Sequence, residues 1–153
     1  MSIYLKEITL ENWEECIELK ISREQEKYLP HSNLKSIAEW KFNPHWTALG
    51  IYIDDIIIGF SMYGTLQDDD PTYDGTMWII RLMIDERYQG NGYGKLALSE
   101  LIKIIKNQGQ HKDIWISFHP ESKTNLNLYS HFGFKQVITG SEAEDEVFYK
   151  LEL

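Results

Sequence analysis

The sequence Arg87-Tyr88-Gln89-Gly90-Asn91-Gly92-Tyr93-Gly94-Lys95 decides which fold we expect. It follows an apolar run from Met77 to Ile84, which predicts a buried strand, and it opens an amphipathic pattern, which predicts a helix. Alternating glycines at such a junction let bare backbone N–H groups approach an anion, and the helix N-terminus adds a positive dipole. The stretch therefore predicts a phosphate-binding loop, and hence an enzyme with a phosphate-bearing cofactor.

Composition restricts the class of protein. The chain has 153 residues, which suits one domain spanning 1–153 with one core. Hydrophobic residues make up 42%, and five Trp, nine Tyr and six Phe argue against disorder. With 15 basic and 24 acidic residues the formal charge is −9, so nucleic acid is not an expected partner. Such a surface attracts small cations, although acidity that only keeps the protein soluble is the simpler interpretation.

Cys16 is the single cysteine, so no internal disulfide is possible, and its helical pattern with Trp13 and Ile17 predicts a small buried hydrophobe. The segment from Met1 to Lys6 lacks the apolar region of a signal peptide, and no apolar run approaches the length of a membrane span. We expect a cytoplasmic protein with no membrane partner. The five histidines show no metal-ligand spacing, so no metal is expected.

The remaining pattern predicts an α/β chain with a mixed sheet covered by helices. The expected strands are 3–8, 46–53, 56–63, 76–84, 114–118, 135–138 and 147–151. The expected helices are 11–20, 34–40, 92–107 and 123–131, with Thr9, Ser32 or Asn33, and Ser122 as caps and Gly109 as a stop. The strands 46–53 and 56–63 should form a hairpin, and the polar connection 22–30 has some helical character.

Two motifs resemble one family. The segment from Gln89 to Gly94 matches the Q/R-x-x-G-x-G/A loop of the GNAT N-acetyltransferases, and the segment from Leu128 to Phe134 resembles their L-Y-x-x-x-G-F motif. The alternative is that the glycines merely shape a turn. The resemblance implies the GNAT fold, with a mostly antiparallel sheet of roughly six or seven strands, about four helices, and a splay between the strands 76–84 and 114–118.

Within that family the chain looks most like the bacterial diamine and spermine/spermidine acetyltransferases. The segment from Ile84 to Gly90, the segment from Gly59 to Gly64 and the aromatic Trp78 carry this resemblance. It implies a small-molecule amine as acceptor. Relatives are often dimers, so we expect a homodimer.

The resemblance also implies acetyl-CoA as the donor, with its pyrophosphate on the glycine loop and its pantetheine amides paired to a strand edge. Asn91 and Tyr93 fill variable positions, Lys95 either adds charge or is a solvated lysine, and Asn125 replaces an amide that relatives carry elsewhere. The cofactor-binding residues implied are Leu82, Met83, Ile84, Gln89, Gly90, Asn91, Gly92, Tyr93, Gly94, Lys95 and Asn125.

The reaction implied is direct attack of an amine on the thioester, which requires a base for the amine and an acid for the thiolate. Tyr129 matches the tyrosine of the family and is the candidate acid; the alternative is a core tyrosine. A backbone N–H near Met83 would stabilise the oxyanion. The base stays open, because Ile80 stands where relatives carry a carboxylate. Substitutes are Glu24 or Glu26 through a water, Glu86, His119, or a chain of waters.

A polyamine acceptor needs acidic groups and aromatic walls. The candidates are Glu24, Glu26, Tyr28, Trp78 and the acidic loop 68–70, which is otherwise an exposed turn. Other interpretations are an acetyltransferase for an amino acid, an aminoglycoside or a protein N-terminus, and a non-catalytic acyl-CoA-binding module.

Overall fold

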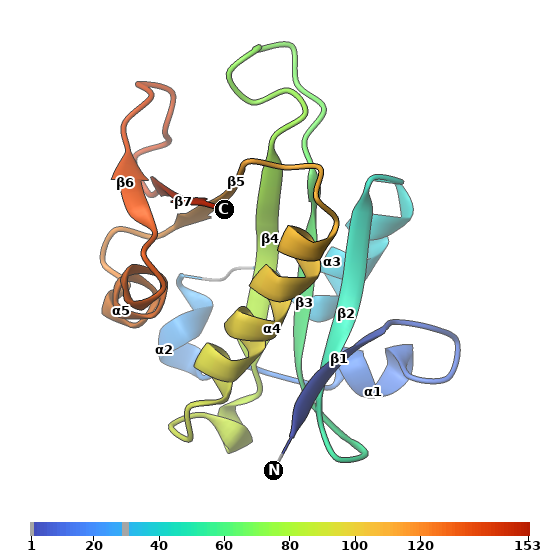
Figure 1. The fold of residues 1–153 in the computed structure, drawn as a ribbon. Helices are drawn as coiled ribbons and strands as arrows, with labels where there is room; N and C mark the ends of the chain where they lie inside the picture. The colour runs from blue at the N-terminus through green and yellow to red at the C-terminus, as the bar shows by residue number, and fades with distance from the viewer. Residues whose placement is uncertain (1, 29–30) are drawn as a thin grey trace.

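The fold is built on one seven-stranded mixed sheet in the order β1-β2-β3-β4-β5-β7-β6 (Figure 1). The computed structural model describes residues 2–28 and 31–153. The strands are β1 (Ile3–Glu7), β2 (Trp46–Ile53), β3 (Ile56–Thr65), β4 (Met77–Ile84), β5 (Asp113–Phe118), β6 (Lys135–Val137) and β7 (Val147–Glu152). Neighbouring strands are antiparallel except for β4 and β5, which are parallel. The predicted mixed sheet is confirmed, and its seven strands follow one another along the chain as expected.

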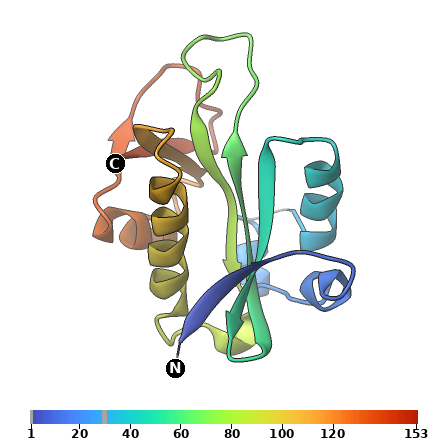
Figure 2. The ribbon, with the colours of Figure 1, turned by 45° about the vertical axis from the view of Figure 1, so that its right-hand side comes forward.

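Helices cover both faces of the sheet. They are α1 (Trp13–Ile17), α2 (Arg23–Glu26), α3 (Asn33–Lys41), α4 (Tyr93–Asn107) and α5 (Lys123–His131), with a short 3₁₀ turn, η1 (Glu86–Tyr88). Figure 2 shows α4 on one side of the sheet and α1 and α3 on the other. Leu98, Leu101 and Ile105 of α4 are fully buried in the core cluster on its side. None of the helices in the described residues is long and apolar enough to cross a membrane.

The described residues hold one α-helix more than the sequence predicts. The additional helix is α2, which lies in the polar connection 22–30 where we expect helical character; positions 29 and 30 of that connection lie outside the described residues. The helices α3, α4 and α5 lie within two residues of their predicted bounds. Ser32 and Ser122 cap α3 and α5, because each hydroxyl accepts a hydrogen bond from the backbone N–H three residues on.

The first helix is shorter than predicted. It begins at Trp13 with Asn12, not Thr9, at its N-cap, and it ends at Ile17 instead of Lys20. Asn12 is buried and its side chain is used to tie the turn to the sheet, donating to the Glu7 carbonyl and to the Tyr52 hydroxyl. The backbone N–H of Lys20 donates to Asp85 instead of continuing the helix. Long-range partners therefore set both ends of α1. Cys16 is buried as predicted, and burial raises the pKa of its thiol to about 12.

The sheet opens between β4 and β5, which pair only at Trp78 and Trp115. The splay that the resemblance implies is therefore confirmed. A bulge in β4 accompanies it, because Tyr63 pairs with Ile79 and Met62 with Arg81, which leaves Ile80 as the extra residue. The rest of β4, from Ile79 to Ile84, leaves a backbone edge that β5 does not occupy.

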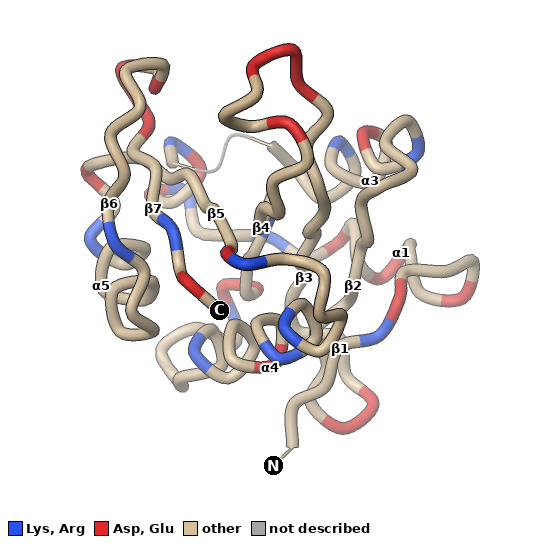
Figure 3. Tube along the Cα trace, turned by 45° about the horizontal axis from the view of Figure 1, so that its top comes forward, with Lys and Arg blue, Asp and Glu red and all other residues tan. Residues whose placement is uncertain are grey.

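The turn between β3 and β4 is rich in acidic residues, with Asp68, Asp69, Asp70 and Asp74. Figure 3 shows them in the turn between β3 and β4, and Figure 1 shows that this turn lies at the opposite end of β4 from η1. Within it, Asp68, Asp70 and Asp74 accept hydrogen bonds from backbone N–H groups of the same turn. The aspartates are exposed and organise the turn itself.

Candidate functional site

The glycine loop joins η1 to the N-terminus of α4. Gly90 and Gly92 both have a φ of 80°, a left-handed backbone conformation that glycine adopts without steric cost. Gly92 is also the N-cap of α4. An added Cβ at Gly90, Gly92 or Gly94 would meet no atom within 4 Å. Open space therefore faces bare backbone at the N-terminus of a 15-residue helix, which is the arrangement that binds phosphate.

Side chains of the loop hold it to the rest of the protein. The amide of Gln89 donates to the carbonyl of Ile84 and to the side-chain oxygen of Gln25, both at 2.8 Å. The amide of Asn91 donates to the carbonyls of Tyr88 and Gln89. Since both side chains serve the loop's own shape, the backbone is what remains to bind a ligand.

Asp85 anchors the start of this loop and was given no role by the sequence. It is 2% exposed and accepts hydrogen bonds from the backbone N–H groups of Lys20 and Arg87 and from Nε of Arg87, the last at 2.7 Å. Burial alone would raise the pKa of this carboxyl, but the hydrogen bonds from Arg87 and Lys20 outweigh it and lower the pKa. An aspartate directly after an apolar strand is the signal that could have found it.

A groove of about 710 Å³ lies along the open edge of β4 and reaches the glycine loop. The first turn of α5, from Ser122 to Asn125, forms part of its wall. It brings together seven of the predicted cofactor-binding residues, namely Leu82, Met83, Ile84, Gln89, Gly90, Gly94 and Asn125. The other four predicted residues, Asn91, Gly92, Tyr93 and Lys95, lie at the loop and the start of α4, outside the described lining; Asn91 and Lys95 are exposed and Tyr93 packs partly against the core.

Tyr129 lies on α5 in the hydrophobic core. It is 7% exposed, its ring stacks on Phe118 with centroids 5.7 Å apart, and Phe134 contacts it edge-on. Burial raises the pKa of its hydroxyl, so the group stays protonated throughout the neutral range. Among the described residues, those that line the two larger cavities do not include Tyr129, although the first turn of its helix does line the groove.

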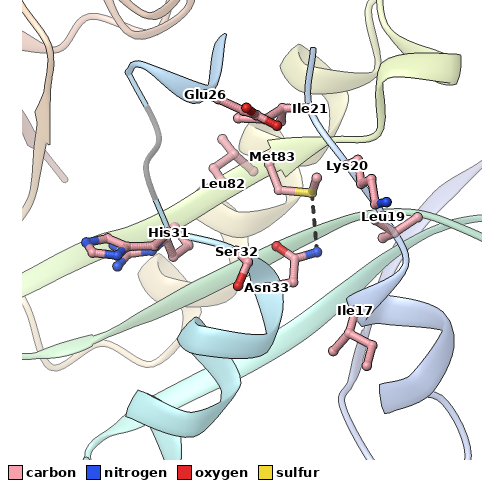
Figure 4. Close-up of a pocket in the computed structure, with 11 residues that line it drawn as sticks. Ile17, Leu19, Lys20, Ile21, Glu26, His31, Ser32, Asn33, Leu82 and Met83 are labelled. Atoms are coloured by element: carbon pink, nitrogen blue, oxygen red, sulfur yellow. Dashed lines mark hydrogen bonds between the residues drawn. The ribbon is translucent and has the colours of Figure 1, made fainter. Parts of the chain in front are cut away.

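A second cavity, of about 520 Å³, adjoins the groove. The two share Ile21, Leu82 and Met83, so they meet at the open edge of β4. Figure 4 shows Glu26, His31 and Met83 around this second cavity. We call it the acceptor cavity, since it is the space next to the groove from which a second molecule could reach β4.

The predicted acceptor residues lie in three different places. Glu26 lines the acceptor cavity, whereas Glu24 and Tyr28 line the groove. The Tyr28 ring lies 4.8 Å from the ring of His119. Trp78 is 7% exposed and packs in an aromatic cluster with Tyr73, Trp115 and Phe148, and its Nε1 donates to Thr76. Among the described residues Trp78 lines neither cavity, because it lies where β4 and β5 still pair.

The polar residue that β4 presents to the acceptor cavity is Arg81, not the bulged Ile80. Nε of Arg81 donates to the Ser36 hydroxyl, Nη1 donates to the Ile80 carbonyl at 2.8 Å, and Nη2 lies 3.8 Å from Glu39. Burial lowers the pKa of this guanidinium, which Glu39 opposes. Of the candidate bases, Glu86 is exposed at the start of η1, and His119 lies beside Tyr28.

Comparison of the amino-acid sequence with known proteins identifies the family of the chain. Residues 8–134 match the sequence model of the Acetyltransferase (GNAT) family. A spermine/spermidine N(1)-acetyltransferase of Bacillus subtilis (strain 168) is 32% identical over 136 residues, which cover 88% of this chain and 89% of that protein. The chain therefore belongs to the GNAT acetyltransferase family, and it is an acetyltransferase.

Solved structures agree on the fold. The PaiA N-acetyltransferase from Thermoplasma acidophilum, solved in complex with coenzyme A, superposes with a TM-score of 0.71 at 22% identity and full coverage of both chains. An aminoglycoside acetyltransferase, also solved with coenzyme A, gives a TM-score of 0.79 at 13% identity, covering 99% of this chain and 95% of the other. The chain therefore shares its fold with solved acetyltransferases, and these two hold coenzyme A.

Proposed function

We propose that this protein transfers the acetyl group of acetyl-CoA to a primary amine of a diamine or polyamine such as spermidine or spermine. The observation that carries the proposal is the open-backbone glycine loop continuous with a 710 Å³ groove along the free edge of β4. The polyamine acceptor is supported by the curated relatives, one named above and a probable spermine N(1)-acetyltransferase of Bacillus subtilis subsp. natto at 30% identity.

The donor fits the groove by chemistry. Backbone N–H groups of the loop and the positive end of α4 suit a pyrophosphate. The free edge of β4 at Leu82, Met83 and Ile84 suits the amides of a pantetheine arm, which can hydrogen-bond as an added strand does. Asn125 offers a side-chain amide on the facing wall. The thioester would then reach the region where groove and acceptor cavity meet.

Transfer requires one bond to form and one to break. The neutral amine nitrogen attacks the thioester carbonyl, its proton leaves to a base, and the C–S bond breaks to release CoA thiolate. A backbone N–H near Met83 would stabilise the oxyanion. Tyr129, on the helix whose first turn lines the groove, would protonate the thiolate.

The acceptor cavity carries charges of both signs. Glu26 is suited to an ammonium group of a polyamine. Arg81 favours a second candidate, an amine that also bears a carboxylate, since a guanidinium binds carboxylates through paired donors. The two candidates differ in which charge of the cavity does the recognition.

A panel of amines tests the proposal. The protein is incubated with acetyl-CoA and spermidine, spermine, short diamines, amino acids, an aminoglycoside and a peptide, and free thiol and product mass are measured. The highest kcat/KM is expected for the polyamines, and Glu26→Gln should raise their KM while leaving that of a monoamine unchanged. Turnover of amino acids alone would favour the Arg81 alternative. Binding of CoA without any acetylated product would support a non-catalytic module.

A further inference from the structure

His31 lies at the acceptor cavity, and no sequence motif marks it as a candidate base. It precedes the N-cap Ser32 of α3, and it lines the same cavity as Leu82 and Met83, the two β4 residues that also line the groove (Figure 4). Its ring is half-buried. Ile80, at the position where a carboxylate was sought, packs with the apolar core cluster on that side of the sheet.

We propose that His31 is the general base that removes the proton from the acceptor ammonium. This proposal rests on the proposed function only in requiring acetyl transfer to an amine. The neutral imidazole takes one proton from the ammonium nitrogen, directly or through a water in the cavity. The freed lone pair forms the C–N bond, the nitrogen gives up its second proton as the C–S bond breaks, and that proton ends on the CoA sulfur. The imidazolium then returns its own proton to solvent.

Histidine suits this step better than the carboxylate that shares the cavity. An alkylammonium has a pKa near ~10, and a base works best when its own pKa lies close to the operating pH. An ordinary imidazole, with a pKa of about 6.5, is closer to neutrality than an ordinary glutamate at about 4.3. Glu26 is left to attract the ammonium and His31 to deprotonate it.

Burial and two nearby cations hold the pKa of the His31 imidazole below its ordinary value. Burial lowers the pKa of its imidazole, Arg81 of β4 and Lys35 of α3 lower it further, and Glu39 of α3 opposes them. Glu26 of α2 and Lys20 line the same cavity. Arg81 is held in place by Ser36 and by the carbonyl of Ile80. The base is therefore ready at neutral pH, and the fixed guanidinium also disfavours the charged form of a nearby amine.

The pH dependence of kcat/KM tests the proposal. For the wild-type protein kcat/KM should rise through a pKa below 6.5 and then level off, because the base must be neutral. His31→Gln should lower kcat/KM about 100-fold at pH 7. The kcat/KM of this variant should then rise steadily with pH, because the amine loses its own proton. His45→Gln, at an exposed position in the turn before β2, is the control and should follow the wild-type profile.

Substitutions of Lys35 and Glu39 should shift the pH dependence of kcat/KM while His31 stays in place. Lys35→Gln should move the acid limb to higher pH, and Glu39→Gln should move it to lower pH. Titration of the His31 imidazole by NMR should give the same shifts with no substrate present. Circular dichroism of His31→Gln should match the wild type.

The outcomes separate this proposal from the proposed function. Wild-type turnover with an unchanged pH profile in His31→Gln would overturn the role of His31 and leave acetyl transfer to an amine intact. Loss of the acid limb in His119→Gln instead would assign the base to that residue and overturn ours. Absence of turnover with every amine would overturn both.

Discussion

The groove and the acceptor cavity meet at β4 but are built in different ways. The groove takes residues from the end of β4, the glycine loop and the start of α4, which are contiguous in sequence, and also from the first turn of α5 and the segment 21–28 that contains α2. The acceptor cavity takes residues from the end of α1, from α2, from the start of α3 and from β4. In the proposed function the donor contacts backbone groups of the glycine loop and of β4, whereas the acceptor contacts side chains such as Glu26 and Arg81. Such a division would let one fold keep its donor and change its acceptor.

The largest loss of activity is expected from a change at the acetyl-transfer step, which needs both the groove and the acceptor cavity. If Tyr129 acts as we propose, Tyr129→Phe should lower kcat about 100-fold, because it removes the proposed proton donor for the thiolate, while the KM for acetyl-CoA stays the same. The matched control is Tyr149→Phe, since the Tyr149 ring also packs on Phe118. Steady-state kinetics and CoA binding by calorimetry make the measurement. Equal turnover in Tyr129→Phe and wild type would remove Tyr129 from the mechanism.

A smaller effect on kinetics is expected from a substitution in the glycine loop, which changes the groove and leaves the acceptor cavity intact. Gly90→Ala should raise the KM for acetyl-CoA about tenfold, because an L-residue at a φ of 80° costs about 1–2 kcal/mol and the methyl group occupies the space in front of the loop. Gly109→Ala carries similar backbone strain at a φ of 66°, after the end of α4. It should lower the melting temperature and leave this KM unchanged. A tenfold rise in both variants would show that strain, not the loop, determines KM.

The smallest effect on activity is expected where the two regions are tied together. Asp85→Asn should lower kcat/KM only a few-fold but destabilise the protein by about 2 kcal/mol at pH 7, since a buried charged acceptor loses strength for three donors. The pKa of Asp85 is lowered in the folded protein, so its contribution is present above the unfolded pKa of about 3.9 and is lost as pH falls through the folded value. Urea unfolding should therefore show the two proteins converging in stability below pH 4. A constant difference at every pH would contradict this explanation.

The sequence predicted what depends on local pattern. The bounds of α5, its cap Ser122 and the β2–β3 hairpin follow from spacing and turn chemistry, and seven predicted residues do line one groove. What escaped prediction depends on distant partners. Asp85 bonds to a backbone group 65 positions away, and Arg81 reaches Ser36 across 45 positions. His31 carries no motif, and only the placement of α3 on this face of the sheet, where Ser36 accepts a hydrogen bond from Arg81, brings it to the acceptor cavity.

Trp78 belongs to an aromatic cluster at the closed end of the splay, where it holds β4 beside β5. β4 and β5 share one ladder pair, and the indoles of Trp78 and Trp115 stack there with centroids 5.4 Å apart, braced edge-on by Phe148 and Tyr73. This stack lies at the one place where the two halves of the sheet still pair. The two stacked indoles therefore act as a spacer between the halves of the sheet, at the point where the splay begins.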